Sequence, residues 1–253
     1  MVDLHVHSNY SMCAETSSTV RAIVEAAQSA KMEGIGITDH IHPYIEYSVI
    51  DDNRRQLSEL LDSRVRVWIG AEIDVTTLSG RILGEPDFYR SLDYVMAGIH
   101  HYHCDWVARP DLSRDSEDVL NFVHRQIINT VKNPWVHVVA HPWSGLIKNL
   151  KDFPFTYDLI KSEWIEELGY ESIKNGTAVE IPVWALINRE GIINEPCLKH
   201  FVRPLLQTGC FISTGTDAHQ VKNIGKGISK LVDIMTQNGA KPQQFWTPDN
   251  ISR

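Results

Sequence analysis

The sequence of 253 residues contains few cysteines and lacks any long hydrophobic run. Its cysteines form no Cys-x-x-Cys pair, which is typical of neither a disulfide framework nor an all-cysteine zinc site; they are Cys13, Cys104, Cys197 and Cys210. No stretch of about 18 apolar residues occurs that could span a bilayer, and the first residues show no basic segment followed by an apolar one. We therefore expect a cytoplasmic protein with no membrane partner.

Positive charge is scarce as well. Lys and Arg total 24 against 32 Asp and Glu, a formal net charge of −8. Affinity for nucleic acid depends largely on basic residues that neutralise phosphates, so this balance disfavours a nucleic-acid partner without excluding a local basic patch. The sequence also lacks a Gly-x-Ser-x-Gly motif, which disfavours a serine nucleophile. What the chain does have is 43% hydrophobic residues, enough for one large core, and twelve histidines.

Short apolar runs alternate with segments of helical periodicity along the chain. We predict strands at Val2–Val6, Gly34–Thr38, Val65–Ile73, Tyr94–Ile99, Val136–Ala140, Ala178–Val183 and Cys210–Thr214. The predicted helices are Thr19–Glu33, Asn53–Asp62, Pro86–Ser91, Ser116–Val131, Tyr157–Leu168, Glu195–Gln207 and Asn223–Gln237. Because no internal repeat or Pro- or Gly-rich linker interrupts the pattern, residues 1–253 are expected to form a single α/β domain, built as a parallel barrel or an open sheet.

The position of the polar residues distinguishes these two folds. Candidate ligands stand at the C-terminal end of nearly every predicted strand: His5, His7, His40, Glu72, His100, His141, Asp217 and His219. A barrel brings all strand ends to one mouth, whereas an open sheet spreads them along an edge. The sequence therefore predicts a distorted seven-stranded parallel (β/α)7 barrel, similar to a TIM barrel.

Spacing and burial indicate a metal centre at this mouth. His5 and His7 are two residues apart on a strand, so their imidazoles point the same way, and Asp217 and His219 repeat this spacing. An isolated pair of this kind is more often a hydrogen-bonded core histidine beside a solvated one. Glu72, however, lies inside an apolar strand, where a carboxylate is costly unless a cation or hydrogen bonds compensate. With several imidazoles at the same mouth, Glu72 is better explained as a bridge between two metal ions than as half of a buried salt bridge.

Not every histidine has this placement. His101 directly follows His100, and the sequence leaves open which of the two is the ligand. Surface or supporting roles are expected for the histidines that do not end a strand: His42, His101, His103, His124, His137 and His200.

Together these residues carry a resemblance to a known family. The matching segments are Asp3-Leu4-His5-Val6-His7-Ser8, Ile37-Thr38-Asp39-His40, Gly70-Ala71-Glu72, Ala97-Gly98-Ile99-His100, Ala140-His141-Pro142 and Gly215-Thr216-Asp217-Ala218-His219. In this order, spread over essentially the whole chain, they resemble the PHP family, the polymerase and histidinol phosphatase superfamily of metal-dependent phosphoesterases.

The resemblance implies a distorted seven-stranded barrel that holds two or three divalent metal ions, zinc, manganese or iron. The implied ligands are His5, His7, Glu72 and Asp217 for one ion, Glu72, His100 and His141 for a second, and His40 and His219 for a third. Cys13 stands where family members often have a histidine that completes the third site. A thiolate there would favour zinc over manganese. The alternative interpretation is that Cys13 is a small buried hydrophobe.

A cluster of this kind predicts phosphoester hydrolysis, because closely spaced dications activate a bridging water and clamp the attacking and leaving oxygens at phosphorus. Glu72, Asp217 and His219 are the expected catalytic residues, and phosphomonoesters of small molecules, such as histidinol phosphate, are the first-ranked substrates. A nucleotide or oligonucleotide phosphoesterase comes second. Two further alternatives are an amidohydrolase, which would usually carry a lysine where His100 stands, and a non-catalytic PHP scaffold, which would have lost ligands.

Loops after the strands supply candidates for substrate binding. Phosphate usually requires an ammonium or guanidinium group, and Arg189 is preferred here over Arg54 and Lys148. Aromatic residues in the same loops could wall a pocket: Tyr44, Tyr47, Tyr102, Trp106, Trp143 and Trp184. The sequence leaves open the physiological substrate, the identity of the metal and the oligomeric state.

Overall fold

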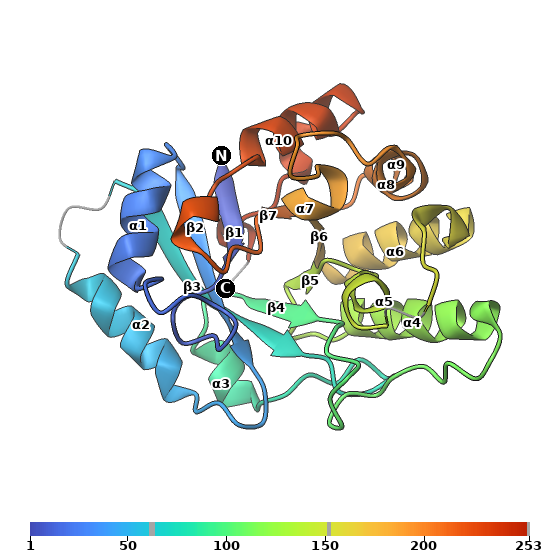
Figure 1. Cartoon of the computed structure of the whole chain (residues 1–253), viewed down its shortest axis with the longest axis horizontal. Helices are drawn as coiled ribbons and strands as arrows, with labels where there is room; N and C mark the ends of the chain where they lie inside the picture. The colour runs from blue at the N-terminus through green and yellow to red at the C-terminus, as the bar shows by residue number, and fades with distance from the viewer. Residues whose placement is uncertain (61–63, 151–152, 252–253) are drawn as a thin grey trace.

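Seven parallel strands form the centre of the molecule (Figure 1). The computed structural model describes residues 1–60, 64–150 and 153–251. The strands are β1 (Val2–Val6), β2 (Gly34–Ile41), β3 (Arg66–Asp74), β4 (Val95–Gly98), β5 (Val138–Ala140), β6 (Ala178–Pro182) and β7 (Ile212–Gly215). Their order in the sheet follows their order in the chain, and each pairs in parallel with the next. This arrangement confirms the predicted seven-stranded α/β barrel.

The barrel closes between β1 and the segment that follows β7. The His7 N–H donates to the Ala218 carbonyl at 2.9 Å, within an isolated parallel bridge between Val6 and Ala218. The buried Asp3 carboxylate accepts the backbone N–H and the hydroxyl of Thr216 at 2.9 and 2.7 Å. An isolated bridge and the hydrogen bonds of Asp3 therefore take the place of a continuous hydrogen-bonded ladder between β1 and β7. The barrel is distorted at this position.

Helices and helical turns lie around the strands (Figure 1). They are α1 (Val20–Ser29), α2 (Ser48–Ser58), α3 (Pro86–Arg90), α4 (Ser116–Val131), α5 (Ser144–Lys148), α6 (Ser162–Asn175), α7 (Val183–Leu186), α8 (Glu195–Cys197), α9 (Arg203–Thr208) and α10 (Ile228–Gln237). Their apolar stripes pack on the strands; in α1 the buried positions are Val20, Ile23, Val24 and Ala27. Within the described ranges, no helix combines the length and apolar character that crossing a bilayer requires.

The polar site lies above an apolar layer inside the barrel. This layer consists of Leu4, Trp68, Tyr94, Met96, Val138, Ala140, Ala178 and Trp246. The register of β1 against β2 shifts between Asp3 and Val6, an irregularity that re-aims side chains. As a result Leu4 joins the apolar layer, while His5 and His7 face the mouth.

Several predicted helix boundaries are wrong. The helix predicted at Asn53–Asp62 is α2, which begins five residues earlier, and the end of that prediction, residues 61 and 62, lies outside the described residues. The segment Tyr157–Leu168 contains a 3₁₀ turn, Tyr157–Leu159, before α6 begins. The helix predicted to start at Asn223 starts only at Ile228, because Gly225 and Gly227 adopt left-handed φ values of 69° and 85°.

The segment Glu195–Gln207 is helical, but a π-helical turn, Leu198–Val202, interrupts it. Pro204 follows this turn and has no N–H to donate to the previous turn, so the ladder must adjust there. Strand β2, in contrast, is longer than predicted and reaches Ile41, because the polar pair Asp39-His40 remains buried within the sheet.

Candidate metal centre

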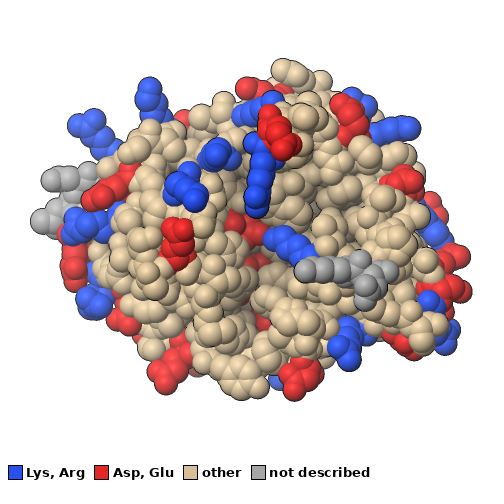
Figure 2. All heavy atoms as spheres, in the orientation of Figure 1, with Lys and Arg blue, Asp and Glu red and all other residues tan. Residues whose placement is uncertain are grey.

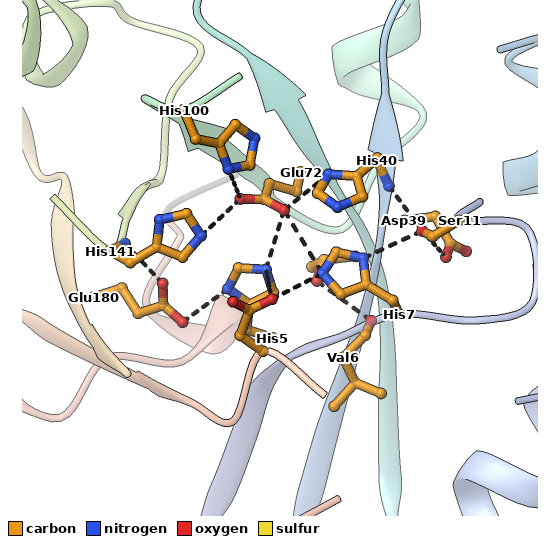
Figure 3. Close-up of polar contacts among 12 residues, drawn as sticks. His5, Val6, His7, Ser11, Asp39, His40, Glu72, His100, His141 and Glu180 are labelled. Carbon is orange, nitrogen blue, oxygen red and sulfur yellow. Dashed lines mark hydrogen bonds and ion pairs between the residues drawn. The ribbon is translucent and has the colours of Figure 1, made fainter. Parts of the chain in front are cut away.

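Glu72 stands at the centre of a ring of imidazoles at the C-terminal ends of the strands (Figure 3). Its side chain is fully buried. Oε2 faces His40 Nδ1 at 3.1 Å, His5 Nε2 at 3.2 Å and His7 Nε2 at 3.6 Å. Oε1 faces His141 Nε2 at 3.0 Å and His100 Nδ1 at 3.5 Å. The structure therefore brings together five histidines, from β1, β2 and the segments after β4 and β5, around one carboxylate.

Asp217 and His219 complete this cluster from the segment after β7. Asp217 Oδ1 lies 3.3 Å from His7 Nε2 and 3.6 Å from His5 Nε2. The His219 ring stacks on His7, with centroids 4.3 Å apart. Barrel closure thus adds a second carboxylate and a sixth imidazole to the site.

The potential ligand atoms form overlapping groups, each able to hold a metal ion. Within each group the atoms all lie within 4.8 Å of one another, and the groups are His5/His7/Asp217, Glu72/His100/His141, His7/His40/His219, His40/His100/His101 and His5/His141/Glu180. The second matches one ligand set that the family resemblance implies, and the first contains three of the four residues of another. The third shares His40 and His219 with the implied third set but contains His7 instead of Cys13.

Buried polar atoms inside the cluster have close neighbours but no well-formed hydrogen bonds. Glu72 Oε1, His40 Nδ1 and His100 Nε2 lie 3.0, 3.1 and 3.3 Å from His141 Nε2, Glu72 Oε2 and Asp74 Oδ1, yet none of the three makes a hydrogen bond of good geometry with the described residues, as buried polar atoms normally do. Gly98 lines the same space: a Cβ atom there would lie 2.6 Å from His100 Nε2 and 2.9 Å from Glu72 Oε1. Buried polar atoms without well-formed hydrogen bonds, around a space kept free by a glycine, fit a bound cation.

Hydrogen bonds behind the cluster fix the orientation of the imidazoles. His5 Nδ1 bonds to Glu180 Oε1 at 2.8 Å, and His141 Nδ1 bonds to Ser144 Oγ at 2.7 Å. His219 Nδ1 donates to the Asp217 carbonyl at 2.9 Å. Bonds of this kind hold the proton on Nδ1 and leave the Nε2 lone pair available to a metal.

His7 is held by a longer relay (Figure 3). Its Nδ1 lies 3.2 Å from Ser11 Oγ, and the Ser11 hydroxyl donates to Asp39 Oδ1 at 2.7 Å. The Asp39 carboxylate also accepts the hydroxyl of Ser8 at 2.6 Å and the amide of Asn53 at 2.7 Å. Asn53 reaches Asp39 from α2, so the position of that helix is tied to the orientation of a candidate ligand.

Buried charges at the site shift several pKa values. Burial alone raises the pKa of Glu72, but His100, His5 and His40 outweigh it and hold the pKa well below its usual range. Burial lowers the pKa of His5, yet the carboxylates of Glu180 and Glu72 raise it well above the ordinary value. Burial lowers the pKa values of His7 and His100 instead, so the imidazoles around the ionised Glu72 differ in charge.

Cys13 lies beside the third ligand group. Cys13 is exposed at the surface, and the His219 and His40 imidazoles lie near its thiol. Burial of the sulfur raises its pKa, but these two imidazoles outweigh the effect and lower it to about 6. None of the candidate ligand groups among the described residues includes Cys13, so its role as a ligand of the third metal stays a prediction.

The predicted phosphate-binding residues lie in different surroundings. Lys148 Nζ lies 2.7 Å from Asp217 Oδ2 and 4.2 Å from the centroid of the Trp184 ring. Arg54 bonds to the Ser91 carbonyl and pairs with Asp93, which precedes β4 at the opposite end from the cluster. Arg189 is exposed in the turn after α7. Of the three, Lys148 is the one in contact with the cluster.

The middle of one face of the molecule is hollowed (Figure 2). Acidic side chains lie recessed in this hollow, and basic side chains border it. Such an arrangement keeps carboxylates available to cations below and ammonium groups available to an anion above.

His100 and His101 share one neighbour, Asp74 Oδ1, which lies 3.3 Å from His100 Nε2. His100 Nδ1 faces Glu72, as described above, whereas His101 Nδ1 bonds to Asp74 Oδ1 at 2.9 Å. Asp74 Oδ2 accepts the indole N–H of Trp106 at 2.8 Å. Of the two, His100 is the one whose ring faces Glu72, and both belong to a candidate ligand group with His40.

Backbone strain is concentrated at the strand ends. His101, His141 and Asp217 have φ values of 58°, 24° and 54°, and Trp143 has 74°. Residues other than glycine rarely adopt these values, and proteins retain them mainly where the surrounding structure holds a functional side chain in place.

Glu180 is the site residue that the sequence interpretation missed. It is fully buried on β6, and its two oxygens accept His5 Nδ1–H and the His141 N–H, both at 2.8 Å. The signal was available, because Glu180 is an acid inside the apolar strand Ala178-Val179-Glu180-Ile181, the same pattern that singled out Glu72. The supporting residues Asp39, Asp74 and Ser144 were missed as well.

Comparison with known proteins gives the family. The PHP domain model matches residues 3–182. A protein of Acetivibrio thermocellus named "Probable phosphatase" is 27% identical over 231 residues, which cover 89% of this chain and 82% of the relative. A Thermotoga maritima protein named "Probable histidinol-phosphatase" is 27% identical over 235 residues, or 92% and 90% of the two chains.

Solved structures show the same fold. A candidate histidinol phosphatase of Listeria monocytogenes superposes with a TM-score of 0.62 at 16% identity, covering 91% of this chain and 99% of the other. The family match ends before Asp217 and His219, which barrel closure brings to the cluster. On the match over residues 3–182, this chain belongs to the PHP domain family.

Proposed function

We propose that this protein is a metal-dependent phosphatase that hydrolyses phosphomonoesters of small molecules. The observation that carries the proposal is Glu72, a fully buried carboxylate whose two oxygens face five imidazoles. Such a group is costly to bury unless cations compensate it. The names of the curated relatives, phosphatase and histidinol-phosphatase, support the reaction class.

The ligand sets predicted from the family resemblance are retained. His5, His7, Glu72 and Asp217 would hold one ion, and Glu72, His100 and His141 a second. His40, His219 and Cys13 would hold a third, with Cys13 favouring zinc among the candidate metals. Divalent ions bound in this way supply hydroxide from water near neutral pH and neutralise charge that develops on the phosphoryl oxygens.

The residues of the chain position the reacting groups. Glu72 is expected to share its two oxygens between neighbouring sites, since Oε1 and Oε2 face different imidazoles. Asp217 turns Oδ1 toward His5 and His7, while Lys148 and the Trp184 indole hold Oδ2. Lys148 and Trp184, at the rim of the site, therefore orient the Asp217 carboxylate.

Lys148 is the best-placed cation for the phosphate. Its ammonium is partly exposed, lies over the Trp184 ring and contacts the cluster only through Asp217. Swinging away from Asp217 would let it donate to a phosphate oxygen above the cluster. Arg189 is retained as a weaker candidate from the rim, and Arg54 would have to leave its partners at the other end of β4.

Metal analysis and a substrate panel test this proposal. The purified protein should contain at least two transition-metal equivalents per chain and lose activity to a strong chelator. It should hydrolyse phosphomonoesters of small alcohols faster than single-stranded DNA, phosphodiesters or an amide substrate. Glu72→Gln and His141→Ala should each abolish hydrolysis, whereas His200→Ala, a histidine outside the cluster, serves as the control. A metal-free, active protein, or an exonuclease without monoesterase activity, would refute the proposal.

A further inference from the structure

Three aromatic rings form a corner on one side of the mouth, hereafter the aromatic corner: His42, Tyr44 and Trp106. His42 stacks on Trp106 with centroids 6.0 Å apart, and Tyr44 meets Trp106 edge-on at 5.4 Å. The His42 and Tyr44 rings are 6.1 Å apart. The rings come from two different loops, one after β2 and one after β4, so barrel geometry and not local sequence brings them together.

A single carboxylate joins this corner to the candidate metal centre. Asp74 Oδ2 accepts the Trp106 indole N–H at 2.8 Å, and Asp74 Oδ1 bonds to His101 Nδ1 at 2.9 Å. His101 in turn stacks on His100, with centroids 3.9 Å apart. Asp74 thus links the Trp106 indole to His101, which stacks on His100 at the edge of the candidate metal centre.

The corner has the exposure of a binding surface. Tyr44 is 77% exposed, although its ring is large and apolar. Trp106 is only partly buried, and Asp74 holds its ring in one orientation. By contrast, Tyr47, a few residues along the same loop, stacks face to face on Phe88 at 4.0 Å. Tyr47 thus stacks face to face within the fold, whereas Tyr44 meets Trp106 edge-on and exposes most of its surface to solvent.

The two sides of the mouth differ in chemistry. Lys148 and Trp184 lie on the side of β5, β6 and β7, next to Asp217. The aromatic corner lies on the side of β2, β3 and β4, next to Asp74. A phosphate held over the cluster by Lys148 would therefore have its ester oxygen and alcohol free to extend toward the aromatic corner.

We propose that the aromatic corner binds a planar ring in the alcohol part of the substrate, so that the protein prefers ring-bearing phosphomonoesters over acyclic polyol phosphates. This inference rests on the proposed phosphatase function and adds the chemical class of the leaving group. The ring would contact the exposed face of Tyr44 and the edge of Trp106, contacts that an acyclic alcohol cannot reproduce.

The test compares two substrates in matched variants. For the wild-type protein, kcat/KM is measured with benzyl phosphate and with glycerol 3-phosphate, and the ratio of the two values is the selectivity. Tyr44→Ala should lower this ratio about fivefold, mainly through KM for benzyl phosphate, which is the magnitude expected for loss of one aromatic contact. Tyr44→Phe should restore it, and Trp106→Phe should lower it less than Tyr44→Ala. Tyr170→Ala, at another tyrosine that is 64% exposed, on α6, is the control.

A binding measurement separates this inference from the proposed function. Calorimetry with benzylphosphonate, which cannot be hydrolysed, should show a Kd about fivefold weaker for Tyr44→Ala than for the wild type or Tyr170→Ala. Hydrolysis of both substrates with the same selectivity in every variant would overturn the aromatic subsite and leave the phosphatase intact. Failure of the wild type to hydrolyse any phosphomonoester would instead overturn the proposed function.

Discussion

Replacing Glu180 with glutamine tests how far the candidate metal centre depends on a group behind its ligands. Glu180 is fully buried and accepts two hydrogen bonds of 2.8 Å, from His5 Nδ1 and from the backbone N–H of His141. Glutamine keeps the size of the side chain but has one acceptor oxygen and an amide group that donates. One of the two buried donors must therefore lose its acceptor, at a cost of about 1–3 kcal/mol.

The consequences are expected in both stability and metal affinity. For a chain of this length, such a loss lowers the Tm by roughly 2–12 °C. Because Glu180 orients one ligand of each of two ligand groups, His5 and His141, metal affinity should fall about 10–100-fold. Thermal unfolding of the metal-free protein measures the first effect, and zinc competition against a chromophoric chelator measures the second.

Two further variants make this test specific. Glu167→Gln removes a carboxylate that pairs with His124 at 2.8 Å on the helical layer, and should leave zinc affinity unchanged. Gly215→Ala keeps Glu180 but places a Cβ atom 2.4 Å from its Oε1, so it should weaken zinc binding in the same direction as Glu180→Gln. Wild-type zinc affinity and wild-type Tm in Glu180→Gln would refute the reasoning.

Three other predictions concern the same centre. Cys13→Ala should lower the metal content by about one equivalent per chain and Cys13→His should restore it; an unchanged count in the alanine variant would show that the thiol is no ligand. Gly98→Ala, which directs a methyl group at His100 and Glu72, should reduce the metal content of a folded protein. Full metal content in this variant would show that the space beside Gly98 is not needed for metal binding. Although burial lowers the pKa values of His5 and His40, nearby carboxylates raise both above the ordinary value, so zinc added at pH 7 must displace protons. Roughly two protons per chain should appear in a weakly buffered indicator assay, and zinc affinity should fall as the pH is lowered; binding without proton release would contradict this.

The fold could be predicted because parallel strands buried on both faces appear as continuous apolar runs. Segments such as Val136–Ala140 and Ala178–Val183 show this pattern, and the observed strands β5 and β6 lie within them. The polar residues at the ends of these runs indicated a barrel mouth, and the structure does bring His5, Glu72 and His141 together. Local sequence patterns were sufficient for this prediction, because the C-terminal ends of parallel strands meet at one end of a barrel.

Features that depend on distant partners could not be predicted in this way. Asn53 was taken as a helix start, but it lies within α2 and reaches across to Asp39, a contact that no local pattern specifies. Glu180 shows the same composition signal as Glu72, but its role becomes clear only when β6 is known to lie beside the His141 backbone. The left-handed φ of Trp143, which follows Pro142, likewise reflects packing against α4 and α6 through His124 and Trp164.

The closure of the barrel also determines when the centre can first exist during synthesis of the protein. Asp3 and Thr216 are 213 positions apart, and the contacts of His5 and His7 with Asp217 span nearly the same distance. As the chain leaves the ribosome, β1 emerges before the other strands, and the bridge between Val6 and Ala218 cannot form until the segment after β7 has also emerged. Contacts of such long sequence separation form late and slowly, because the chain must first be ordered between them. A nascent chain that ends before residue 217 has no complete His5/His7/Asp217 group, so this group can take up an ion only after Asp217 has left the ribosome.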